Sequence, residues 1–288
     1  MPELPEVETV RKGLEQGFSS AQLKKIIVRR DKLRFAIPSD LQARLTGSTV
    51  THYERRAKYL LWHLKQGDCL LMHLGMSGRL TIFDAAQAAS PNLPSPEKHD
   101  HLEFHCHSGR IVRYNDPRRF GFVLLLAQQD LAQQALLARL GPEPLTPSFD
   151  AHYAFEQAQK RSCAIKALIM DQRFVVGVGN IYASEALFAA QIHPLSAANR
   201  LDLTQWQALV CAIKAVLSRA IEAGGSSLRD HRQTDGTLGY FQHEWKVYGR
   251  AAEACPRCQA RISKITQQQR ASYFCPSCQT LQARSDER

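Results

Sequence analysis

The sequence has no apolar run that approaches the ~20 residues needed to span a bilayer, which argues against a membrane-spanning protein. Its first residues lack the basic segment and apolar stretch of a secretory signal peptide. Acidic residues are scarce as well, since 27 Asp and Glu face 37 Lys and Arg and leave a net charge of +10. Such an excess is typical of proteins that bind polyanions, with nucleic acid ahead of anionic membrane. We therefore expect a cytoplasmic, bacterial-type protein with a polyanionic partner and no membrane association.

The common nucleotide-binding motifs are missing too. Residues 177–180, Gly-Val-Gly-Asn, open a predicted helix, and glycines at such a place let backbone amides approach an anion. The stretch has neither the third glycine of a dinucleotide fingerprint nor the Lys-Ser/Thr pair of a P-loop. A plain tight turn explains it equally well, so nucleotide cofactors are disfavoured.

The first half of the chain predicts a helix followed by a β-sandwich. Val7, Val10 and Leu14 recur at helical spacing after Pro5. Short stretches rich in apolar or β-branched residues then predict strands at 25–29, 49–56, 59–64, 69–74, 79–83, 100–107, 110–114 and 122–126. Many short strands at close spacing are typical of a sandwich or barrel.

Two details of this half are less regular. Residues 85–96 contain three prolines and predict a surface loop. In 100–107 the alternation places three histidines and Glu103 on one face. No spacing there fixes a metal geometry, so we expect a solvated face, with a metal site as the lesser alternative.

The second half predicts helices and then a small cysteine-bearing tail. Residues 141–147 form a proline-rich hinge, after which apolar residues follow the helical period. Thr204 and Gln207 predict a capping box for a long helix that ends at Gly224. The polar residues 226–240 predict a mobile loop. We assign the helix and sandwich to 1–140, the hinge to 141–149, the helical domain to 150–240 and the tail to 241–288, an α+β multidomain chain.

Four of the eight cysteines form a metal-binding pattern. Two C-x-x-C pairs, separated by sixteen residues, predict a tetrahedral zinc site closing a β-hairpin, formed by Cys255, Cys258, Cys275 and Cys278. A closed four-thiolate site is structural rather than catalytic. Disulfides are the lesser alternative, because the chain shows no export signal. The other four cysteines are scattered singly and predict buried small side chains.

The first six residues, Met-Pro-Glu-Leu-Pro-Glu, can be interpreted in two ways. Removal of Met1 would expose Pro2 as a terminal secondary amine, a class that titrates near ~7.7–8.0 and can attack an aldehyde-like carbon to give a cationic iminium. Glu3 beside it could transfer a proton at the same centre. Alternatively, the prolines only stiffen the entry to a helix.

Several turns carry residues suited to a DNA duplex. Residues 116–121, Asp-Pro-Arg-Arg-Phe-Gly, combine arginines that can bind base edges with an aromatic that can wedge between base steps. Met76 stands between two glycines in 73–78, and 55–58 holds three cations. A core methionine and a solvated charge run are the plainer interpretations.

Taken together, these motifs resemble the bacterial formamidopyrimidine-DNA glycosylases, the base-excision repair enzymes that remove oxidised purines such as 8-oxoguanine. The resemblance covers nearly the whole chain in the family's order, at 2–9, 55–60, 73–78, 97–101, 116–121, 177–185 and 247–279. It implies an N-terminal helix on a β-sandwich, a helix-two-turn-helix domain and a zinc hairpin, with DNA bound in the cleft of a monomer.

The resemblance also implies roles for individual residues. Pro2 would attack C1′ of the damaged nucleoside and Glu3 would protonate the opening sugar ring. Lys58 would donate a proton in β-elimination and Arg270 would act in δ-elimination, so that the enzyme nicks the DNA as a lyase. The expected DNA contacts are Met76, His99, Arg118, Phe120, Arg161 and Asn180, with Met76, Arg118 and Phe120 filling the gap left by the extruded nucleotide.

Two alternatives stay open at this stage. An endonuclease VIII-like glycosylase shares the terminal Pro-Glu and the zinc hairpin but prefers oxidised pyrimidines; Leu4, Met76 and Phe120 favour the purine enzyme. A non-enzymatic zinc DNA-binding protein would not need Pro2 and Glu3. Residues 226–240 depart locally from the family pattern, so lesion preference is the least constrained expectation.

Overall fold

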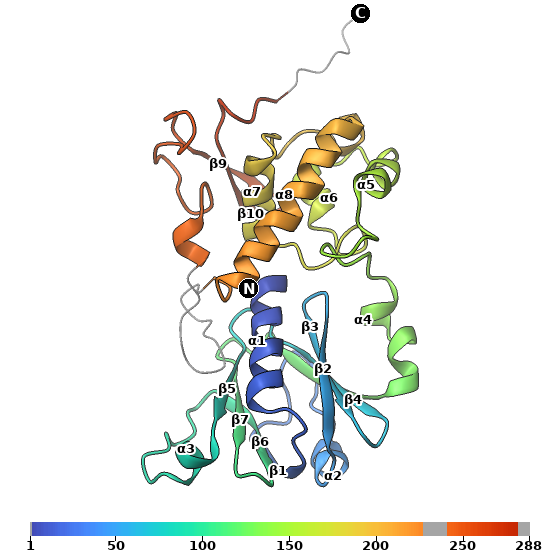
Figure 1. Ribbon diagram of the computed structural model, residues 1–288, viewed down its shortest axis with the longest axis vertical. Helices are drawn as coiled ribbons and strands as arrows, with labels where there is room; N and C mark the ends of the chain where they lie inside the picture. Colours follow the sequence, from blue (N-terminus) through green and yellow to red (C-terminus); the bar gives the residue numbers. More distant parts are fainter. Residues whose placement is uncertain (1, 227–240, 282–288) are drawn as a thin grey trace, which may run out of the picture. The chain divides into compact units, whose positions relative to one another are not determined.

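A computed structural model describes residues 2–226 and 241–281 of the chain. By its contacts the chain divides into two compact units, one of Met1–Ala138 with Ala223–Gln242 and the other of Arg139–Glu222 with His243–Arg288 (Figure 1). The domain boundaries drawn from the sequence stay a prediction. Of the loop expected at 226–240, residues 227–240 lie outside the described residues. Within the described ranges, no helix is long and apolar enough to cross a bilayer.

The first unit begins with helix α1 (Leu4–Gly17) and contains two antiparallel four-stranded sheets. The strand order is β1-β6-β7-β5 in one sheet and β2-β3-β4-β8 in the other (Figure 1). The eight predicted strands are confirmed with small shifts of their ends, as β1 (Leu23–Val28), β2 (Val50–Arg56), β3 (Tyr59–Leu64), β4 (Asp68–His73), β5 (Arg79–Phe83), β6 (Asp100–Cys106), β7 (Ile111–Asn115) and β8 (Phe122–Ala127).

The main core of this unit lies between the sheets and under α1. Period-2 alternation turns Trp62 of β3 and Phe104 of β6 inward, where their ring centroids are 4.8 Å apart, and α1 adds Val7, Val10 and Leu14. A smaller cluster around Leu61 and Leu71 covers the other face of the second sheet beneath η1 (Gln128–Gln133) and α4 (Ala135–Ala138). A short helix, α2 (Leu41–Leu45), lies between β1 and β2 in the sequence.

Three expectations from the sequence were wrong in part, two for this unit and one, on the scattered cysteines, for the second unit. Residues 85–89 form the short helix α3 (Ala85–Ala89), because the Asp84 carboxylate accepts the Gln87 N–H and caps it. The histidine face of residues 100–107 is solvated only toward its end: His101 and Glu103 are buried, whereas His105 is half-buried and His107 is exposed. Of the scattered cysteines, Cys69 and Cys106 are buried as expected, whereas Cys163 and Cys211 are exposed.

The buried face of β6 is stabilised by ion pairs instead of water. Arg113 donates to Glu103 at 2.8 Å and Arg29 approaches the same carboxylate at 3.2 Å. Burial alone would raise the pKa of Glu103, but His105, Arg29 and Arg113 lower it to about 2. These bonds use the polar atoms that a metal site would have needed.

Two turns of the first unit meet at Asp116, a fully buried carboxylate. It accepts hydrogen bonds from the Ser77 hydroxyl at 2.6 Å, the Gly121 N–H at 2.8 Å and the Tyr114 hydroxyl at 3.3 Å. The backbones of the turns pack so closely that a Cβ on Gly75 would collide with Phe120 and Gly121. Asp116 therefore fixes residues 73–78 against residues 116–121.

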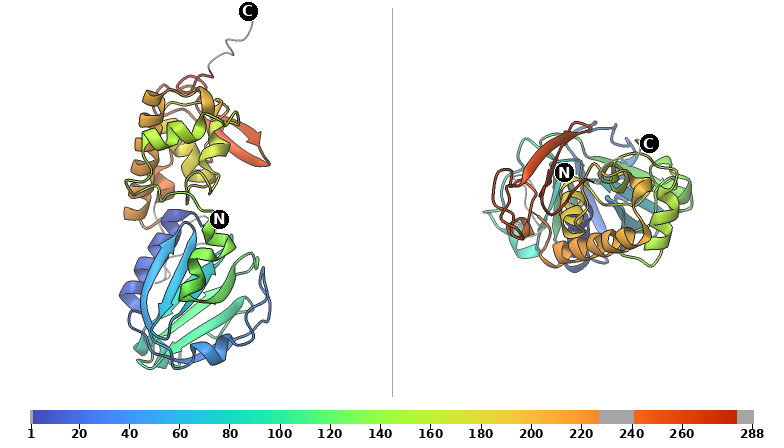
Figure 2. Two further views of the ribbon diagram at one scale, coloured as in Figure 1. Left: turned by 90° about the vertical axis from the view of Figure 1, so that its right-hand side faces the viewer. Right: turned by 90° about the horizontal axis from the view of Figure 1, so that it is seen from above.

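The second unit is built around α7 (Asn180–Ala189), which is buried on nearly all sides. α6 (Ile165–Ile169) and α8 (Leu203–Glu222) pack against it, and α5 (Ala151–Ala158) packs against α8. The short 3-10 segment η2 (Ala198–Arg200) also belongs to this unit, whereas η3 (Phe241–Glu244) crosses the boundary in sequence between the two units. The hairpin of β9 (Ser263–Gln267) and β10 (Arg270–Phe274) completes the second unit (Figures 1 and 2).

The long helix α8 is capped two residues earlier than the sequence suggested. Asp202 Oδ1 accepts the Gln205 N–H at 2.7 Å, and Gln205 Oε1 accepts the Asp202 N–H at 3.0 Å. The predicted box of Thr204 and Gln207 was therefore wrong, because both residues lie inside the first turns of the helix.

We expect stability to fall in mild acid because of His73. Burial, with Lys58 and Arg34 nearby, lowers the pKa of His73 from 6.5 to about 4. Between these values the unfolded chain binds a proton that the folded chain does not, so the free energy of unfolding should drop by up to about 3 kcal/mol as the pH falls from 6.5 to 4. Urea unfolding at several pH values would measure this. His73→Gln should flatten the slope and His152→Gln, on exposed α5, should keep it; equal slopes in all three proteins would contradict the assignment.

Asp116→Ala should lower the free energy of unfolding by about 3 kcal/mol, because it leaves buried donors of Ser77, Tyr114 and Gly121 without their acceptor. Urea or thermal unfolding would measure the loss. Asp84→Ala is the matched control, since it removes an exposed carboxylate cap worth only about 1 kcal/mol. A loss no larger than that of the control would show that Asp116 does not hold the two turns together.

Candidate functional site

The N-terminal residues of α1 are held in place rather than left to fray. Pro2 is buried, and Glu3 is only 2% exposed. Glu3 and Glu6 form a reciprocal capping box in which the Glu3 N–H donates to Glu6 Oε2 at 2.8 Å. A segment that is normally mobile at a chain end is thereby fixed at its second and third residues.

Glu6 also binds a segment 220 positions away in the sequence. Its other oxygen, Oε1, accepts the backbone N–H of Ser226 at 2.8 Å and the Ser226 hydroxyl at 2.9 Å. Gly225 precedes it with φ +78°, and a Cβ there would approach Glu6 Oε1 to 3.2 Å. The Glu-x-x-Glu spacing of residues 3 and 6 was the sequence signal for half of this arrangement.

Lys58 lies in the two-residue turn between β2 and β3. Arg56 pairs with Tyr59, and Ala57 has φ +56°, in the left-handed region. Arg55 donates to Glu8 of α1 at 2.9 Å and to the Ala57 carbonyl at 3.1 Å. Arg55 therefore joins the turn that carries Lys58 to the helix that begins at Glu3. Lys58 is itself largely buried.

Met76, Arg118 and Phe120 project from the two turns that Asp116 joins. Met76 is 37% and Phe120 46% exposed, both unusual for large apolar side chains on an ordinary surface. The Arg118 guanidinium stacks over the Phe120 ring at 4.9 Å. His99 is attached to the turn of residues 116–121, since its carbonyl accepts the Asp116 N–H at 3.0 Å. The structure thus brings four predicted DNA contacts to one pair of turns.

In the second unit, a buried lysine that sequence reasoning missed organises Asn180. Lys166 Nζ donates to Asn180 Oδ1 at 2.7 Å, to the Ser272 hydroxyl at 2.7 Å and to the Ala271 carbonyl at 3.0 Å. Asn180 Nδ2 donates to the same Ala271 carbonyl at 3.0 Å. The first residue of α7 is therefore fixed to β10, next to Arg270. The apolar neighbours of Lys166 in residues 164–168, Ala-Ile-Lys-Ala-Leu, were the only sequence signal that this lysine is buried.

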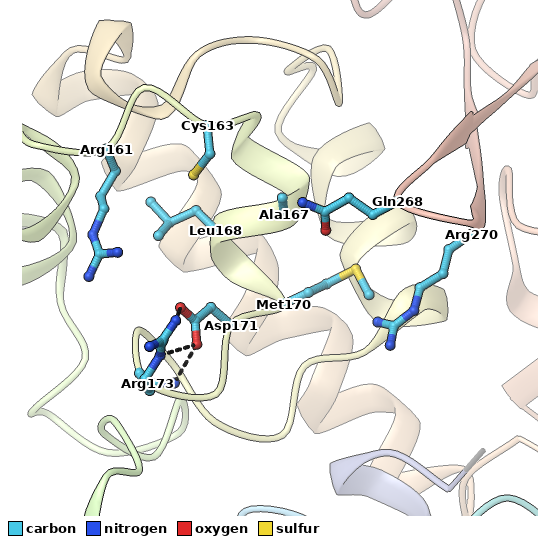
Figure 3. Close-up of a pocket in the computed structure, with 9 residues that line it drawn as sticks. All are labelled: Arg161, Cys163, Ala167, Leu168, Met170, Asp171, Arg173, Gln268 and Arg270. Atoms are coloured by element: carbon cyan, nitrogen blue, oxygen red, sulfur yellow. Dashed lines mark hydrogen bonds and ion pairs between the residues drawn. The ribbon is translucent and has the colours of Figure 1, made fainter.

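An open pocket of about 450 Å³ in this unit contains Arg161, Arg173 and Arg270. Figure 3 shows Arg161 and Arg270 on opposite sides of it, and Arg173 paired with Asp171 through bonds of 2.9 and 3.1 Å. Leu168 and Met170 line the floor between them. Two predicted site residues, Arg161 and Arg270, thus border one basic hollow.

Arg270 is presented by a strained hairpin turn. Gln267 pairs with Arg270 across the two-residue turn of Gln268 and Gln269. These glutamines have φ of 45° and 61°, a left-handed pair that hairpin twist requires and that glycine or asparagine would adopt at lower cost.

The four cysteines of the tail fit a zinc ion. Sγ atoms are 3.9 Å apart for Cys255 and Cys278 and 3.4 Å apart for Cys258 and Cys275. Tetrahedral Zn–S bonds of ~2.3 Å imply sulfur separations of about 3.8 Å, so the set is positioned to bind one zinc ion. Burial would raise the pKa of Cys255, but N–H groups of Arg257 and Cys258 help lower it to about 7, which favours the thiolate.

Buried polar side chains attach this tail to α7. Gln279 accepts the Cys275 N–H at 2.8 Å and donates to the Ile192 carbonyl at 2.8 Å. Glu185 accepts three consecutive backbone N–H groups, from Lys246, Val247 and Tyr248, at 2.8 to 3.0 Å. Val247 and Ile262 of the tail also pack with Phe188 of α7.

Comparison with known families covers both units. The family model described as "Formamidopyrimidine-DNA glycosylase N-terminal domain" matches residues 1–123. The model for the "Formamidopyrimidine-DNA glycosylase H2TH domain" matches residues 140–232, and the "Zinc finger found in FPG and IleRS" matches residues 252–281.

Individual relatives agree along the full length. The chain is 47% identical to the formamidopyrimidine-DNA glycosylase of Rhodopseudomonas palustris over 97% of its own length and 100% of the relative's. It is 48% identical to that of Magnetococcus marinus, over 97% and 99% of the two chains.

Solved structures agree as well. The Lactococcus lactis Fpg in complex with abasic-site DNA aligns with a TM-score of 0.87 at 34% identity, over 96% of this chain and 99% of that one. The MutM (Fpg) protein of Thermus thermophilus aligns with a TM-score of 0.85 at 36% identity, over 98% and 100%. By these matches along both units, the chain belongs to the formamidopyrimidine-DNA glycosylase family.

Proposed function

We propose that this chain is a DNA glycosylase and abasic-site lyase of base-excision repair that removes oxidised purines such as 8-oxoguanine and formamidopyrimidines. Family membership over the full length supports this function. Lactococcus lactis Fpg structures, at 34 to 35% identity, contain abasic-site DNA and Fapy-dG DNA. The observation that carries the proposal is the buried, capped Pro2-Glu3 start of α1, which such chemistry needs at the terminus.

In the proposed first step, Met1 has been removed and the Pro2 nitrogen attacks C1′ of the damaged nucleoside. The C1′–N bond breaks and the base leaves with its electron pair, taking up the proton that the Pro2 nitrogen loses. The C1′–O4′ bond then breaks as Glu3 donates a proton to the ring oxygen and the nitrogen lone pair forms the C=N bond. The product is an iminium between Pro2 and C1′. A terminal amine suits this role because its pKa class, ~7.7–8.0, leaves far more of it unprotonated at neutral pH than a lysine.

The iminium then acts as an electron sink for strand cleavage. It acidifies C2′, so loss of a C2′ proton expels the 3′ phosphate in β-elimination, with Lys58 in the proton-donor role. A second elimination expels the 5′ phosphate, with Arg270 in the corresponding role. Hydrolysis of the remaining iminium returns Pro2 as a free amine and leaves a one-nucleoside gap with phosphates on both ends.

The exposed turns of the first unit supply the contacts that base extrusion needs. Met76 and Phe120 offer apolar surface to the base stack, and Arg118 stacks on Phe120 beside them. Filling the gap offsets part of the few kcal/mol that extrusion costs. Asp116 acts through these residues as a positioning group, because it fixes the turns that carry them.

The second unit supplies contacts to the backbone of the DNA. Arginines bind phosphate oxygens without regard to sequence, which suits Arg161 and Arg270 on the basic pocket. Asn180 contacts the strand from the start of α7, with Lys166 fixing its amide. The zinc ion, when bound, holds the four thiolates and so stabilises the hairpin that presents Arg270; its closed site leaves no position for substrate.

The protein acts as a monomer on double-stranded DNA that contains oxidised bases or abasic sites, since one chain carries every proposed catalytic group. Its place of action is the bacterial cytoplasm, where it associates with the nucleoid through DNA.

A second candidate function differs from the first in the class of damaged base that the enzyme prefers. A complex of the Lactococcus lactis enzyme contains DNA with an oxidised pyrimidine, so a family member binds that lesion class. An endonuclease VIII-like preference for pyrimidines is therefore the alternative, and a DNA-binding protein without activity is the other. One trapping experiment separates all three.

Borohydride should trap a covalent adduct when the protein meets an 8-oxoguanine duplex, because reduction turns the iminium into a stable amine. Pro2→Gly should lower the adduct yield at least about tenfold, since a primary amine gives an imine that loses its positive charge readily. Denaturing gel electrophoresis measures the yield. Arg11→Lys, in the same helix, is the control and should trap like the wild type.

The other outcomes of this experiment are equally informative. Faster trapping on a thymine glycol duplex than on 8-oxoguanine would assign the pyrimidine preference. Binding to both duplexes without any adduct would contradict the glycosylase mechanism and leave a DNA-binding protein.

A further inference from the structure

A cluster of three metal-ligating side chains lies on the second sheet of the first unit. His52 and Glu54 belong to β2 and His63 to β3, and one ligand atom from each lies within 4.8 Å of the others. His63 Nε2 is 2.9 Å from Glu54 Oε2, and the His52 and His63 rings stack with centroids 4.1 Å apart. None of the three has a role in the proposed repair reaction.

A β-bulge places these residues on one face of the sheet. Val50 pairs with Leu64 and His52 pairs with His63, so Thr51 is the extra residue on β2. Without the bulge, His52 would point to the same side as buried Val50; with it, His52 and Glu54 share the face of His63 while Tyr53 points into the core. Bulges often re-aim side chains at functional positions.

Hydrogen bonds to the other ring nitrogens select the tautomer that binds metals. Gln128 Oε1 lies 2.7 Å from His63 Nδ1, and an amide oxygen only accepts, so Nδ1 carries the proton. The Thr51 hydroxyl donates to the His63 carbonyl at 3.0 Å and therefore accepts from His52 Nδ1 at 3.1 Å. In both neutral rings the lone pair is then on Nε2, and His63 directs it at a carboxylate oxygen that is also an acceptor.

Two acceptors at 2.9 Å repel each other unless a cation or a proton joins them. Histidines that ligate metals almost always donate the other ring N–H to an oxygen, as both do here. We propose that His52, Glu54 and His63 form a binding site for a divalent transition-metal ion such as Zn²⁺, separate from the thiolate site and from the repair chemistry.

To bind an ion, the cluster needs the His52 ring to rotate out of its parallel stack with His63. A tetrahedral zinc ion at ~2.0–2.1 Å from each ligand atom requires those atoms to be about 3.3 Å apart. In the structure they are up to 4.8 Å apart. His63 is buried and fixed by Gln128, whereas His52 and Glu54 are exposed and can rotate toward it. Two imidazoles and one carboxylate leave a fourth position for water, a donor set that suits zinc.

Zinc titration of the holoenzyme, with the cysteine site already filled, tests the proposal. Equilibrium dialysis with metal analysis should find a second zinc per chain. His52→Asn and Glu54→Gln, both at exposed positions, should each weaken that second site at least about tenfold while the first stays filled. His152→Asn, an exposed histidine in the other unit, is the matched control and should change nothing.

Two further measurements keep the result specific. Gln128→Ala removes no ligand, yet loss of the outer hydrogen bond should weaken the second site about 10- to 100-fold. In ¹⁵N spectra of the histidine rings, zinc should shift the Nε2 signals of His52 and His63 and leave that of His152 in place. A single zinc per chain, as expected if His63 is an imidazolium paired with Glu54, would overturn the proposal. So would a second zinc that both His52→Asn and Glu54→Gln retain.

Discussion

The chemistry proposed for this family member depends on holding a chain terminus still. A nucleophile at residue 2 would ordinarily share the mobility of a free end, and a few tenths of an ångström of disorder weakens catalysis that relies on orientation. Glu6 removes that freedom through one carboxylate: Oε2 accepts the Glu3 N–H, and Oε1 accepts the N–H and the hydroxyl of Ser226. Arg55, bound to Glu8, then fixes the Lys58 turn to the same helix. Four hydrogen bonds thus hold the start of α1 in one position.

The same principle recurs at the residues proposed to contact DNA. Met76, Arg118 and Phe120 are exposed on turns, but buried Asp116 fixes the backbone beneath them. Asn180 is fixed by buried Lys166, and the zinc-bearing tail is fixed by Glu185 through three consecutive N–H groups. Each buried charge has several hydrogen bonds, as its desolvation requires. The exposed groups can therefore be apolar or basic, as DNA demands, without loosening the turns that carry them.

The sequence predicted what is periodic or local. Alternation predicted the eight strands, and cysteine spacing predicted the zinc hairpin, because both signals need no partner distant in sequence. It failed where a remote partner decides: His101 and Glu103 were expected in solvent, but His101 bonds to the Asp116 carbonyl, and Arg29 and Arg113 pair with Glu103. Asp202 rather than Thr204 caps α8, since only the structure shows which residue precedes the first turn. The Glu6–Ser226 and Lys166–Ala271 bonds span 220 and 105 residues, beyond any local pattern. The positions proposed for catalysis and DNA contact came from family resemblance rather than from such patterns.

The central claim is that the Pro2 nitrogen is the nucleophile. This nitrogen can react only after Met1 has been removed. While Met1 is attached, that nitrogen is a tertiary amide without a usable lone pair. Preparations that differ in the fraction of chains lacking Met1, determined by intact mass, can be compared by the burst of product in a single turnover on 8-oxoguanine DNA. The burst amplitude should rise in proportion to the fraction that has lost one methionine. A preparation that retains Met1 throughout and still shows a full burst would contradict the claim.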